Sequence, residues 1–571
     1  MRKASILLLL SGTIFLSAIF SAASAQNAVP FNTSEAAHWA DSVMKTLTPD
    51  ERIGQLFMVA AYSDTASHDN SMARDTALIR EQKIGGLIFF KGSPLRQALL
   101  TNFYQSLSRV PLLIGMDAEW RLAMRLDSVP TFPFQMTAAA AGSDSLVYLM
   151  GAEIAKECKR LGVQEDFAPV IDINANPDNP IIGMRSFGED KRQVTAMGMA
   201  YMKGLQSEGV LACGKHFPGH GDTKTDSHLS LPVVDYPMSR LDTLELYPFR
   251  SLFENGLASV MVAHLFVPAL DSTKNRASSL SPKVVNGLLK EKMNFKGLVF
   301  SDALNMKGVA LYSKPGEVDL KALLAGNDVL LFSQDVPKAI EEIKKAIENK
   351  EITQDEIDSR CRKILMAKAW TGLNHYHPVD TLGLVKDINS GQADEIIKRI
   401  AKNAVTLLAN RNNLIPLKRL DTLKIASLVI GDTLPDEFQL RMNDYADVKH
   451  FNMPMNSPDT VIKTILPKLK GFNLIIVGVT HTLTKPQDTF NMKPVAIKMI
   501  DTLEKRFPVI LDFFSDPYLL SYLPQVDRAN ALLMSYQSLP ATMDYSAQAI
   551  FGGIGTKGRL PVTASSNYRR G

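Results

Sequence analysis

The chain has 571 residues, a net charge of +4 and a charged fraction of 21%, so it is long enough for several domains and ordinary in composition for a globular protein. Its basic residues form no long run, which argues against nucleic acid or an anionic membrane as a partner.

The first 25 residues have the pattern of a secretory signal peptide. A basic start precedes an apolar run from Ile6 to Phe20, and small residues end the segment at Ala25. The apolar run is shorter than the roughly 20 residues that a membrane-spanning helix needs. We therefore predict export to the periplasm or the exterior, with no stable membrane insertion after signal cleavage.

Short apolar runs alternate with amphipathic stretches over residues 34–372. A helical period near 3.6 marks the segments that begin at Ser145 and Lys191. The apolar runs read as strands buried on both faces, and they begin at Ile53, Ile84, Pro111, Phe167, Val210, Ala258, Gly297 and Asn327. This alternation predicts an α/β fold, a (β/α)₈ TIM-like barrel.

Charged and polar side chains fall at the carboxyl ends of several predicted strands. Active sites of such barrels occupy this face, so we expect these side chains to converge there. They are Asp117, Asp172, Lys215 with His216, His264 and Asp302.

A second, smaller α/β domain follows a polar, turn-rich linker at residues 373–393. Apolar runs beginning at Lys424, Asn473, Pro508 and Asn530 alternate with helical patterns over residues 394–566. This predicts a parallel or mixed sheet covered by helices, an α/β sandwich. The sequence does not indicate what this domain contributes to function, nor the oligomeric state.

The stretch CGKHFPGHGDTKTDSH, residues 213–228, holds three of the ten histidines of the chain. Its glycines and proline permit a tight loop that folds polar side chains over the barrel mouth. Asp226 can hold one imidazole nitrogen of His228, which makes His228 a proton donor and acceptor near neutral pH. Asp302, at a rigid strand end facing the same cavity, is a candidate nucleophile.

Metal binding is an alternative use of the same stretch. A zinc site would make the barrel a metal-dependent amidohydrolase, but the spacing matches no strong zinc motif. The candidate ligands are His216, His220, His228, Asp222 and Asp226. Our leading interpretation needs no metal and no organic cofactor.

Three segments resemble the β-N-acetylglucosaminidases of glycoside hydrolase family 3. They are KHFPGHGDT followed by DSH, SDALNM downstream, and FAPVIDINANPDNPIIGMRSFGED upstream. The resemblance covers the barrel from about Leu47 to Gly372, and continues from NAVTLLANRNNLIPL to GRLPVT in the second domain. It implies a TIM-like barrel followed by an α/β sandwich domain.

The resemblance also implies roles for individual residues. Asp302 matches the nucleophile that forms a covalent glycosyl-enzyme, His228 the general acid/base, and Asp226 its dyad partner. The residues that match those holding the non-reducing sugar are Asp117, Arg125, Arg185, Lys215 and His216. The implied activity is exo-acting, retaining hydrolysis of terminal GlcNAc from cell-wall fragments, as in peptidoglycan recycling, or from chitooligosaccharides.

One segment departs from the family pattern. Family members commonly read DQEGGRVQR where this chain reads DAEWRLAMR, so Trp120 and Arg121 replace two glycines. Trp120 can stack on the face of a sugar ring or have a structural role in packing. Alternatives to the leading interpretation are a family 3 β-glucosidase, a GlcNAc phosphorylase and a non-catalytic glycan-binding protein. A binder has no need for both Asp302 and His228.

Overall fold

The structure is a computed structural model, and it describes residues 28–225, 231–310 and 314–571. The predicted signal peptide lies outside the described residues, and so do Asp226 and His228. Among the helices that are described, none is long and apolar enough to cross a membrane.

The first domain is a barrel of parallel strands, as predicted. Its sheet has the order β7-β6-β5-β4-β3-β2-β1-β8. Backbone hydrogen bonds also join β7 and β8, where the Val329 N–H donates to Val299 O at 3.0 Å and the Ser301 N–H donates to Val329 O at 3.1 Å. The strands are β1 (Phe57–Ser63), β2 (Gly86–Gly92), β3 (Leu113–Met116), β4 (Glu165–Asp166), β5 (Leu211–Phe217), β6 (Ser259–Val262), β7 (Leu298–Ser301) and β8 (Leu330–Leu331).

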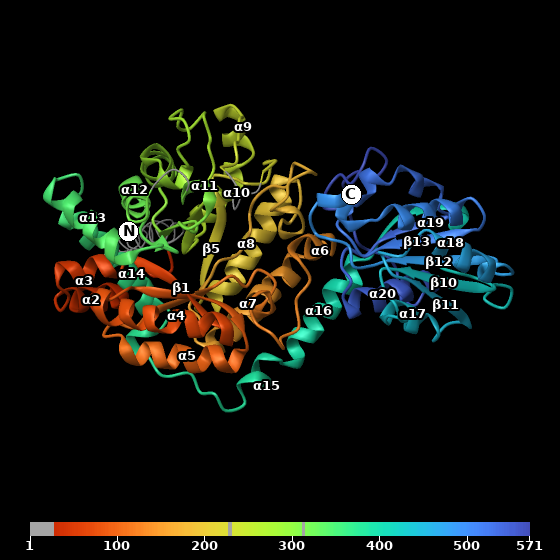
Figure 1. Cartoon of the computed structure of the whole chain (residues 1–571), viewed down its shortest axis with the longest axis horizontal. Coiled ribbons are helices and arrows are strands. Elements are labelled where there is room, and N and C mark those ends of the chain that lie inside the picture. Colours follow the sequence, from red (N-terminus) through yellow and green to blue (C-terminus); the bar gives the residue numbers. More distant parts are fainter. Residues whose placement is uncertain (1–27, 226–230, 311–313) are drawn as a thin grey trace, which may run out of the picture.

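Helices surround this barrel (Figure 1). The predicted helices near Ser145 and Lys191 are confirmed as α7 and α8. In α7 the Ser143 hydroxyl caps the first turn by accepting from the Leu146 N–H, and the helix ends at Gly162, whose φ is +79°. The barrel helices include α2 (Ser34–Met44), α5 (Pro94–Leu107), α7 (Asp144–Leu161), α8 (Lys191–Ser207), α10 (Leu246–Glu254), α12 (Glu317–Ala325), α13 (Val336–Glu348) and α14 (Gln354–Trp370).

The start of the first predicted strand is wrong. Its first residues belong to helix α3 (Pro49–Gly54), and β1 begins at Phe57. A reciprocal capping box starts this helix, because the Thr48 hydroxyl accepts from the Glu51 N–H and the Glu51 carboxylate accepts from the Thr48 N–H. Helix capping therefore makes this segment helical, although its hydrophobic sequence alone predicts a strand.

The position of the fourth strand is also wrong. Strand β4 is Glu165–Asp166, ahead of the apolar run that we assigned to it. Pro169 has no N–H to donate to a ladder, and beyond β4 the chain forms an isolated bridge with β5 between Val170 and Lys215 rather than a continuous strand. Asp172 therefore lies on the loop after β4 rather than at the end of a regular strand.

The second domain contains a mixed sheet of order β11-β10-β12-β13-β14-β9. Only the edge strand β9 is antiparallel to its neighbour. The strands that we predicted are present as β10, β12, β13 and β14, whereas the edge strands β9 and β11 were missed because their burial is incomplete. The strands are β9 (Thr406–Asn410), β10 (Ile425–Ile430), β11 (Val448–Met453), β12 (Leu474–Val479), β13 (Val509–Phe513) and β14 (Ala531–Met534).

Helices cover both faces of this second sheet, which makes a sandwich (Figure 1). Apolar side chains of α18 (Thr460–Ile465) and α19 (Pro494–Glu504) form one core with the sheet. Those of α17 (Glu437–Met442) and α20 (Pro540–Phe551) form another on the opposite face. The central strands are buried on both sides, as their continuous apolar sequences predict.

The segment between the domains runs along the barrel and contains α15 (Leu384–Ile388) before α16 (Gly391–Ala404). The Asn102 amide donates to Val379 O at 2.9 Å and holds the segment against α5. The domain boundaries that we placed from sequence stay a prediction.

The carboxyl ends of the second domain's strands face the barrel. After β13, the Tyr518 hydroxyl donates to Asn174 O at 3.0 Å. After β14, the Gln537 side-chain oxygen accepts from the Phe134 N–H at 2.6 Å and from the Thr137 hydroxyl at 2.8 Å. Asn174 and Phe134 lie on barrel loops that follow β4 and β3, so loops at strand carboxyl ends meet from both domains.

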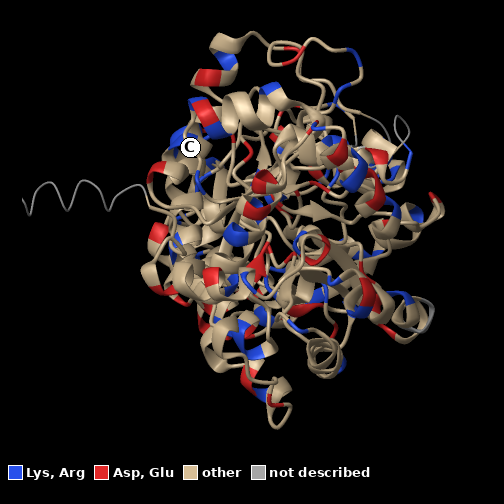
Figure 2. Cartoon of the chain, turned by 90° about the vertical axis from the view of Figure 1, so that its left-hand side faces the viewer, with Lys and Arg blue, Asp and Glu red and all other residues tan. Residues whose placement is uncertain are grey.

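Charged residues of both signs are interspersed on the side of the molecule seen in Figure 2.

The loop after β3 is tied to the rest of the barrel by Arg121, one of the residues that replace a family glycine. Its Nε lies 2.8 and 2.9 Å from the two Glu157 oxygens, and its Nη2 donates to Ile388 O at 2.6 Å. The φ of Arg121 is +83°, a backbone conformation that favours glycine. The buried ion pair with Glu157 thus keeps Arg121 in a backbone conformation that glycine adopts more easily.

We predict that Arg121→Ala lowers the free energy of unfolding by about 3–5 kcal/mol, because it leaves the Glu157 carboxylate buried without its partner. The loss of unfolding free energy should be smaller for Arg121→Gly than for Arg121→Ala by about 1 kcal/mol or more, since glycine adopts this positive φ without strain. Denaturant unfolding of the variants measures both.

Arg362→Ala is the matched control for this prediction, because Arg362 is 39% exposed whereas Arg121 is fully buried. Removing the exposed pair of Arg362 with Asp41 costs about 1 kcal/mol or less. Equal losses for Arg121→Ala and Arg362→Ala would contradict the role given to burial.

Candidate active site

One pocket at the carboxyl ends of the barrel strands gathers most of the predicted site residues. Asp226 and His228 lie outside the described residues. The predicted residues that line the pocket are Asp117, Arg125, Arg185, Lys215, His216 and Asp302.

A chain of alternating charges forms one wall of this pocket. Lys215 Nζ lies 2.8 Å from both Asp117 Oδ1 and Glu119 Oε1. Arg185 faces the same Glu119 with two nitrogens, Nη2 at 2.7 Å from Oε1 and Nε at 2.9 Å from Oε2. Arg125 closes the other end of the chain through an ion pair with Asp117. Each buried charge therefore has an opposite charge within hydrogen-bond distance.

Opposite charges control the ionisation of these carboxyls. Burial by itself raises the pKa of Glu119, but Arg185 and Lys215 outweigh it and hold that pKa at about 2. Burial likewise opposes ionisation of Asp117, yet Lys215 and Arg125 hold its pKa well below the usual value. Burial lowers the pKa of Lys215, and the two carboxylates more than restore it. All three groups are charged at neutral pH.

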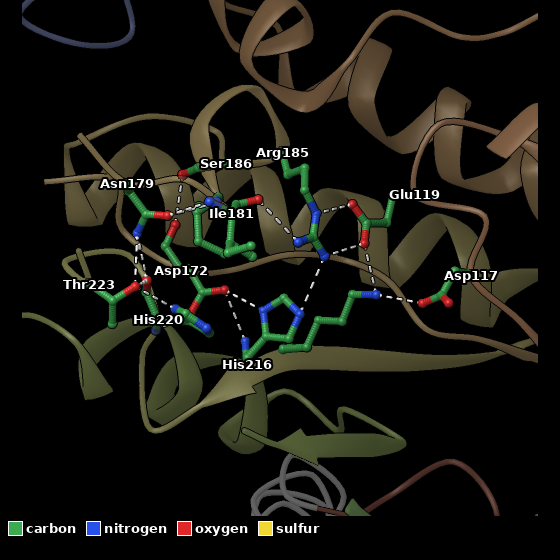
Figure 3. Close-up of polar contacts among 12 residues, drawn as sticks. Asp117, Glu119, Asp172, Asn179, Ile181, Arg185, Ser186, His216, His220 and Thr223 are labelled. Carbon is green, nitrogen blue, oxygen red and sulfur yellow. Dashed lines mark hydrogen bonds and ion pairs between the residues drawn. The ribbon is translucent and has the colours of Figure 1, made fainter. Parts of the chain in front are cut away.

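His216 continues the chain, as Figure 3 shows. Its Nε2 lies 3.3 Å from Arg185 Nη2, and its Nδ1 lies 2.7 Å from Asp172 Oδ2. A carboxylate can only accept, so Nδ1 carries a proton and Asp172 orients the His216 ring. Burial raises the pKa of Asp172, but His216 and His220 bring it below its usual value.

The glycine-rich loop after β5 is anchored on the same carboxylate. The His220 N–H donates to Asp172 Oδ1 at 2.6 Å. A Cβ atom at Gly221 would lie 1.8 Å from Ile173 O, so only glycine permits the loop to lie this close to the loop after β4. Burial, and then the neighbouring His216, lower the pKa of His220 to about 4. His220 is therefore neutral and lines the pocket.

Asp302 follows β7 and is held by the backbone. Its N–H donates to Val262 O at 2.9 Å, and its Oδ1 accepts from the Ala303 N–H at 2.8 Å. His264 supports the same turn, since its Nε2 lies 3.0 Å from Ala303 O. His264 was predicted only as a strand-end residue, and its place beside Ala303 is a supporting one.

Trp120 lies at the rim of the pocket. It lines the pocket and packs edge-on against Phe134 at a centroid distance of 4.8 Å. Both of the roles that we considered for Trp120 from sequence are therefore compatible with its position.

The geometry of the described residues does not support the alternative that this stretch binds a metal ion. In residues 28–225, 231–310 and 314–571, no group of histidine, cysteine, aspartate and glutamate side chains has the arrangement of a metal site. Two of the candidate ligands are engaged elsewhere, because Asp222 pairs with Arg240 and His220 Nδ1 lies 2.8 Å from the Thr223 hydroxyl.

Sequence reasoning missed three residues of the pocket and its support. Glu119 follows Asp117 by two residues and keeps its place in the family pattern, which was a usable signal. Asp172 was noted at a strand end but not placed in the site. Lys485 comes from the second domain and lines the pocket, and no local sequence signal points to it.

A strand-end carboxylate among fixed cations and carboxylates at the mouth of a barrel suits the hydrolysis of a glycoside. The family described as Glycosyl hydrolase family 3 N terminal domain matches residues 48–367. The chain therefore belongs to glycosyl hydrolase family 3.

Individual relatives are similar over much of the chain. A beta-N-acetylglucosaminidase/beta-glucosidase from Cellulomonas fimi is 26% identical over 401 residues, which is 69% of this chain and 70% of the relative. Beta-hexosaminidase A from Pseudoalteromonas piscicida is 30% identical over 56% of this chain and 61% of its own length. A family 3 beta-N-acetylglucosaminidase structure from Paenibacillus sp. str. FPU-7 has a TM-score of 0.76 and 28% identity, over 91% of this chain and 99% of that one.

We predict that Glu119→Gln lowers kcat/KM by about 100-fold, because Lys215 and Arg185 lose the charge that fixes their positions. Steady-state kinetics on an aryl β-glycoside of GlcNAc measure the effect. A double variant with Arg185→Lys should fall by much less than the product of the two single effects, since both changes disrupt one contact.

Glu165→Gln is the matched control for Glu119. Glu165 is as buried, but it contacts the Ser259 hydroxyl rather than a cation, and burial raises its pKa well above the usual value. A neutral amide replaces a neutral acid there, so kcat/KM should stay within about threefold. Equal losses for Glu119→Gln and Glu165→Gln would mean that Glu119 only stabilises the barrel.

Proposed function

We propose that the chain is an exo-acting, retaining β-N-acetylglucosaminidase that removes terminal GlcNAc from cell-wall fragments or chitooligosaccharides. The observation that carries the proposal is the place of Asp302, whose carboxylate lines the same pocket as the Asp117–Lys215–Glu119–Arg185 chain. The relatives that carry the names β-N-acetylglucosaminidase and β-hexosaminidase support the choice of sugar.

In the proposed first step, Asp302 attacks the anomeric carbon and the bond to the leaving-group oxygen breaks. That oxygen takes a proton from His228, with Asp226 as its partner, in the roles that the family resemblance gives them. In the second step His228 takes a proton from water, and the water oxygen displaces Asp302 from the anomeric carbon. Two inversions return the β configuration.

The wall of fixed charges binds the sugar ring in this proposal. Lys215 and Arg185 donate to hydroxyl or acetamido oxygens, and Asp117 accepts from a hydroxyl. His216, oriented by its contact with Asp172, can turn its Nε2 from Arg185 to a sugar hydroxyl. A site preorganised in this way binds without rearranging its charges as the transition state forms.

The setting of the reaction is part of the proposal. The predicted signal peptide supports an exported enzyme, periplasmic or secreted, acting on wall fragments as they are recycled. The chemistry of the proposed steps uses only side chains and water.

We predict that the protein hydrolyses 4-nitrophenyl β-GlcNAc and that Asp302→Ala lowers kcat by about 10³-fold or more, because the covalent intermediate is lost. Azide added to Asp302→Ala should restore turnover and give the α-glycosyl azide, since azide attacks from the face that the carboxylate occupied. Asp302→Ala activity within tenfold of the wild type would overturn the assignment.

A β-glucosidase activity is the second candidate, because the Cellulomonas fimi relative carries both names. Comparing kcat/KM for the 4-nitrophenyl glycosides of GlcNAc and glucose separates the two. Repeating the assay in phosphate and analysing for sugar 1-phosphate distinguishes hydrolysis from phosphorolysis.

A further inference from the structure

The second domain places a cation in the catalytic pocket. Lys485 lies in the segment that follows β12, and its side chain is exposed. It nevertheless lines the same pocket as Asp302 and Asn305, which come from the barrel loop after β7. The pocket is therefore built by both domains.

The segment that carries Lys485 is fixed at its base. Strand β12 lies beside β10 where the strand order of the sheet reverses, which is where sheets of this kind place ligand-contacting loops. Asp432, after β10, accepts from the Thr480 hydroxyl at 2.8 Å and lies 2.8 Å from His481 Nε2. These contacts tie the beginning of the segment to the neighbouring strand.

The same segment lies against the barrel loop that carries Arg185. A Cβ atom at Gly183 would lie 3.1 Å from Thr484 O, which is closer than most Cβ atoms lie to a neighbouring atom. Gly183 is two residues before Arg185, and Thr484 is next to Lys485. The loop that supplies a sugar-binding arginine and the loop that supplies Lys485 thus pack together.

Burial divides the pocket into a floor and a rim. The floor carries the buried polar side chains of Glu119, Lys215 and His216, together with buried apolar ones. The rim has partly exposed aromatic rings and exposed polar side chains. Its members include Phe90, Trp120, Phe332, Asn305 and Lys485.

We propose that Lys485 belongs to the leaving-group subsite and selects glycosides whose leaving group carries a carboxylate. This inference rests on the proposed exo-glycosidase function, because an exo-acting site that binds the terminal sugar at its polar floor directs the leaving group to the rim. A partly solvated ammonium at the rim pairs with a carboxylate and repels a second cation. The aromatic rings beside it suit the apolar face of a sugar.

The test compares two chromogenic substrates, 4-nitrophenyl β-GlcNAc and 3-carboxy-4-nitrophenyl β-GlcNAc, which differ only by a carboxylate. The ratio of kcat/KM for the carboxylated to the neutral substrate is measured for the wild type, Lys485→Met and Lys485→Glu. Differences in the intrinsic reactivity of the two phenols cancel when the ratios are compared between proteins. Lys498→Met, on α19 of the same domain, is the control, because Lys498 is 62% exposed and pairs with Asp459.

We expect Lys485→Met to lower the ratio by about three- to tenfold and Lys485→Glu to lower it further, with both effects shrinking at high salt. Lys498→Met should keep the wild-type ratio. Ratios unchanged in both Lys485 variants would overturn the inference while leaving the glycosidase function intact. Failure of the wild type to hydrolyse the neutral GlcNAc glycoside would overturn the proposed function first, and the inference with it.

Discussion

The structure depends on keeping four charges side by side at the mouth of the barrel, two of which, Lys215 and Glu119, are buried. Asp117, Lys215, Glu119 and Arg185 come from three different loops and strands, and each is stable there only because the next is opposite in sign. The arrangement makes these four donors and acceptors permanent, since none of the four changes protonation near neutral pH. His216, oriented by Asp172, completes the row.

The two domains meet through the loops at the carboxyl ends of their strands. In the barrel these loops carry the proposed nucleophile and the charged wall. In the second sheet they carry Tyr518 and Gln537, which bind the barrel backbone, and Lys485, which enters the pocket. The second domain therefore does more than cover the barrel, because fixing its strand ends against the barrel loops also shapes the outer part of the site.

The barrel and the order of its parts could be predicted because strands buried on both faces read as continuous apolar runs. Errors arose where local chemistry overrides hydrophobicity, as with the capping box at Thr48 and the missing N–H of Pro169. Strand ends identified most of the pocket, since parallel strands deliver their last residues to one face. Lys485 could not be predicted, because its place depends on how two separately folded units dock.

The central claim is that one GlcNAc ring is held between Asp302 and the charged wall. The most direct measurement is a crystal structure of the enzyme trapped with a 5-fluoro derivative of GlcNAc that forms a slow glycosyl-enzyme. The account predicts a bond from an Asp302 oxygen to the anomeric carbon, with ring substituents in hydrogen-bond contact with Lys215 and Arg185. A sugar attached to another residue, or lying away from these two cations, would contradict it.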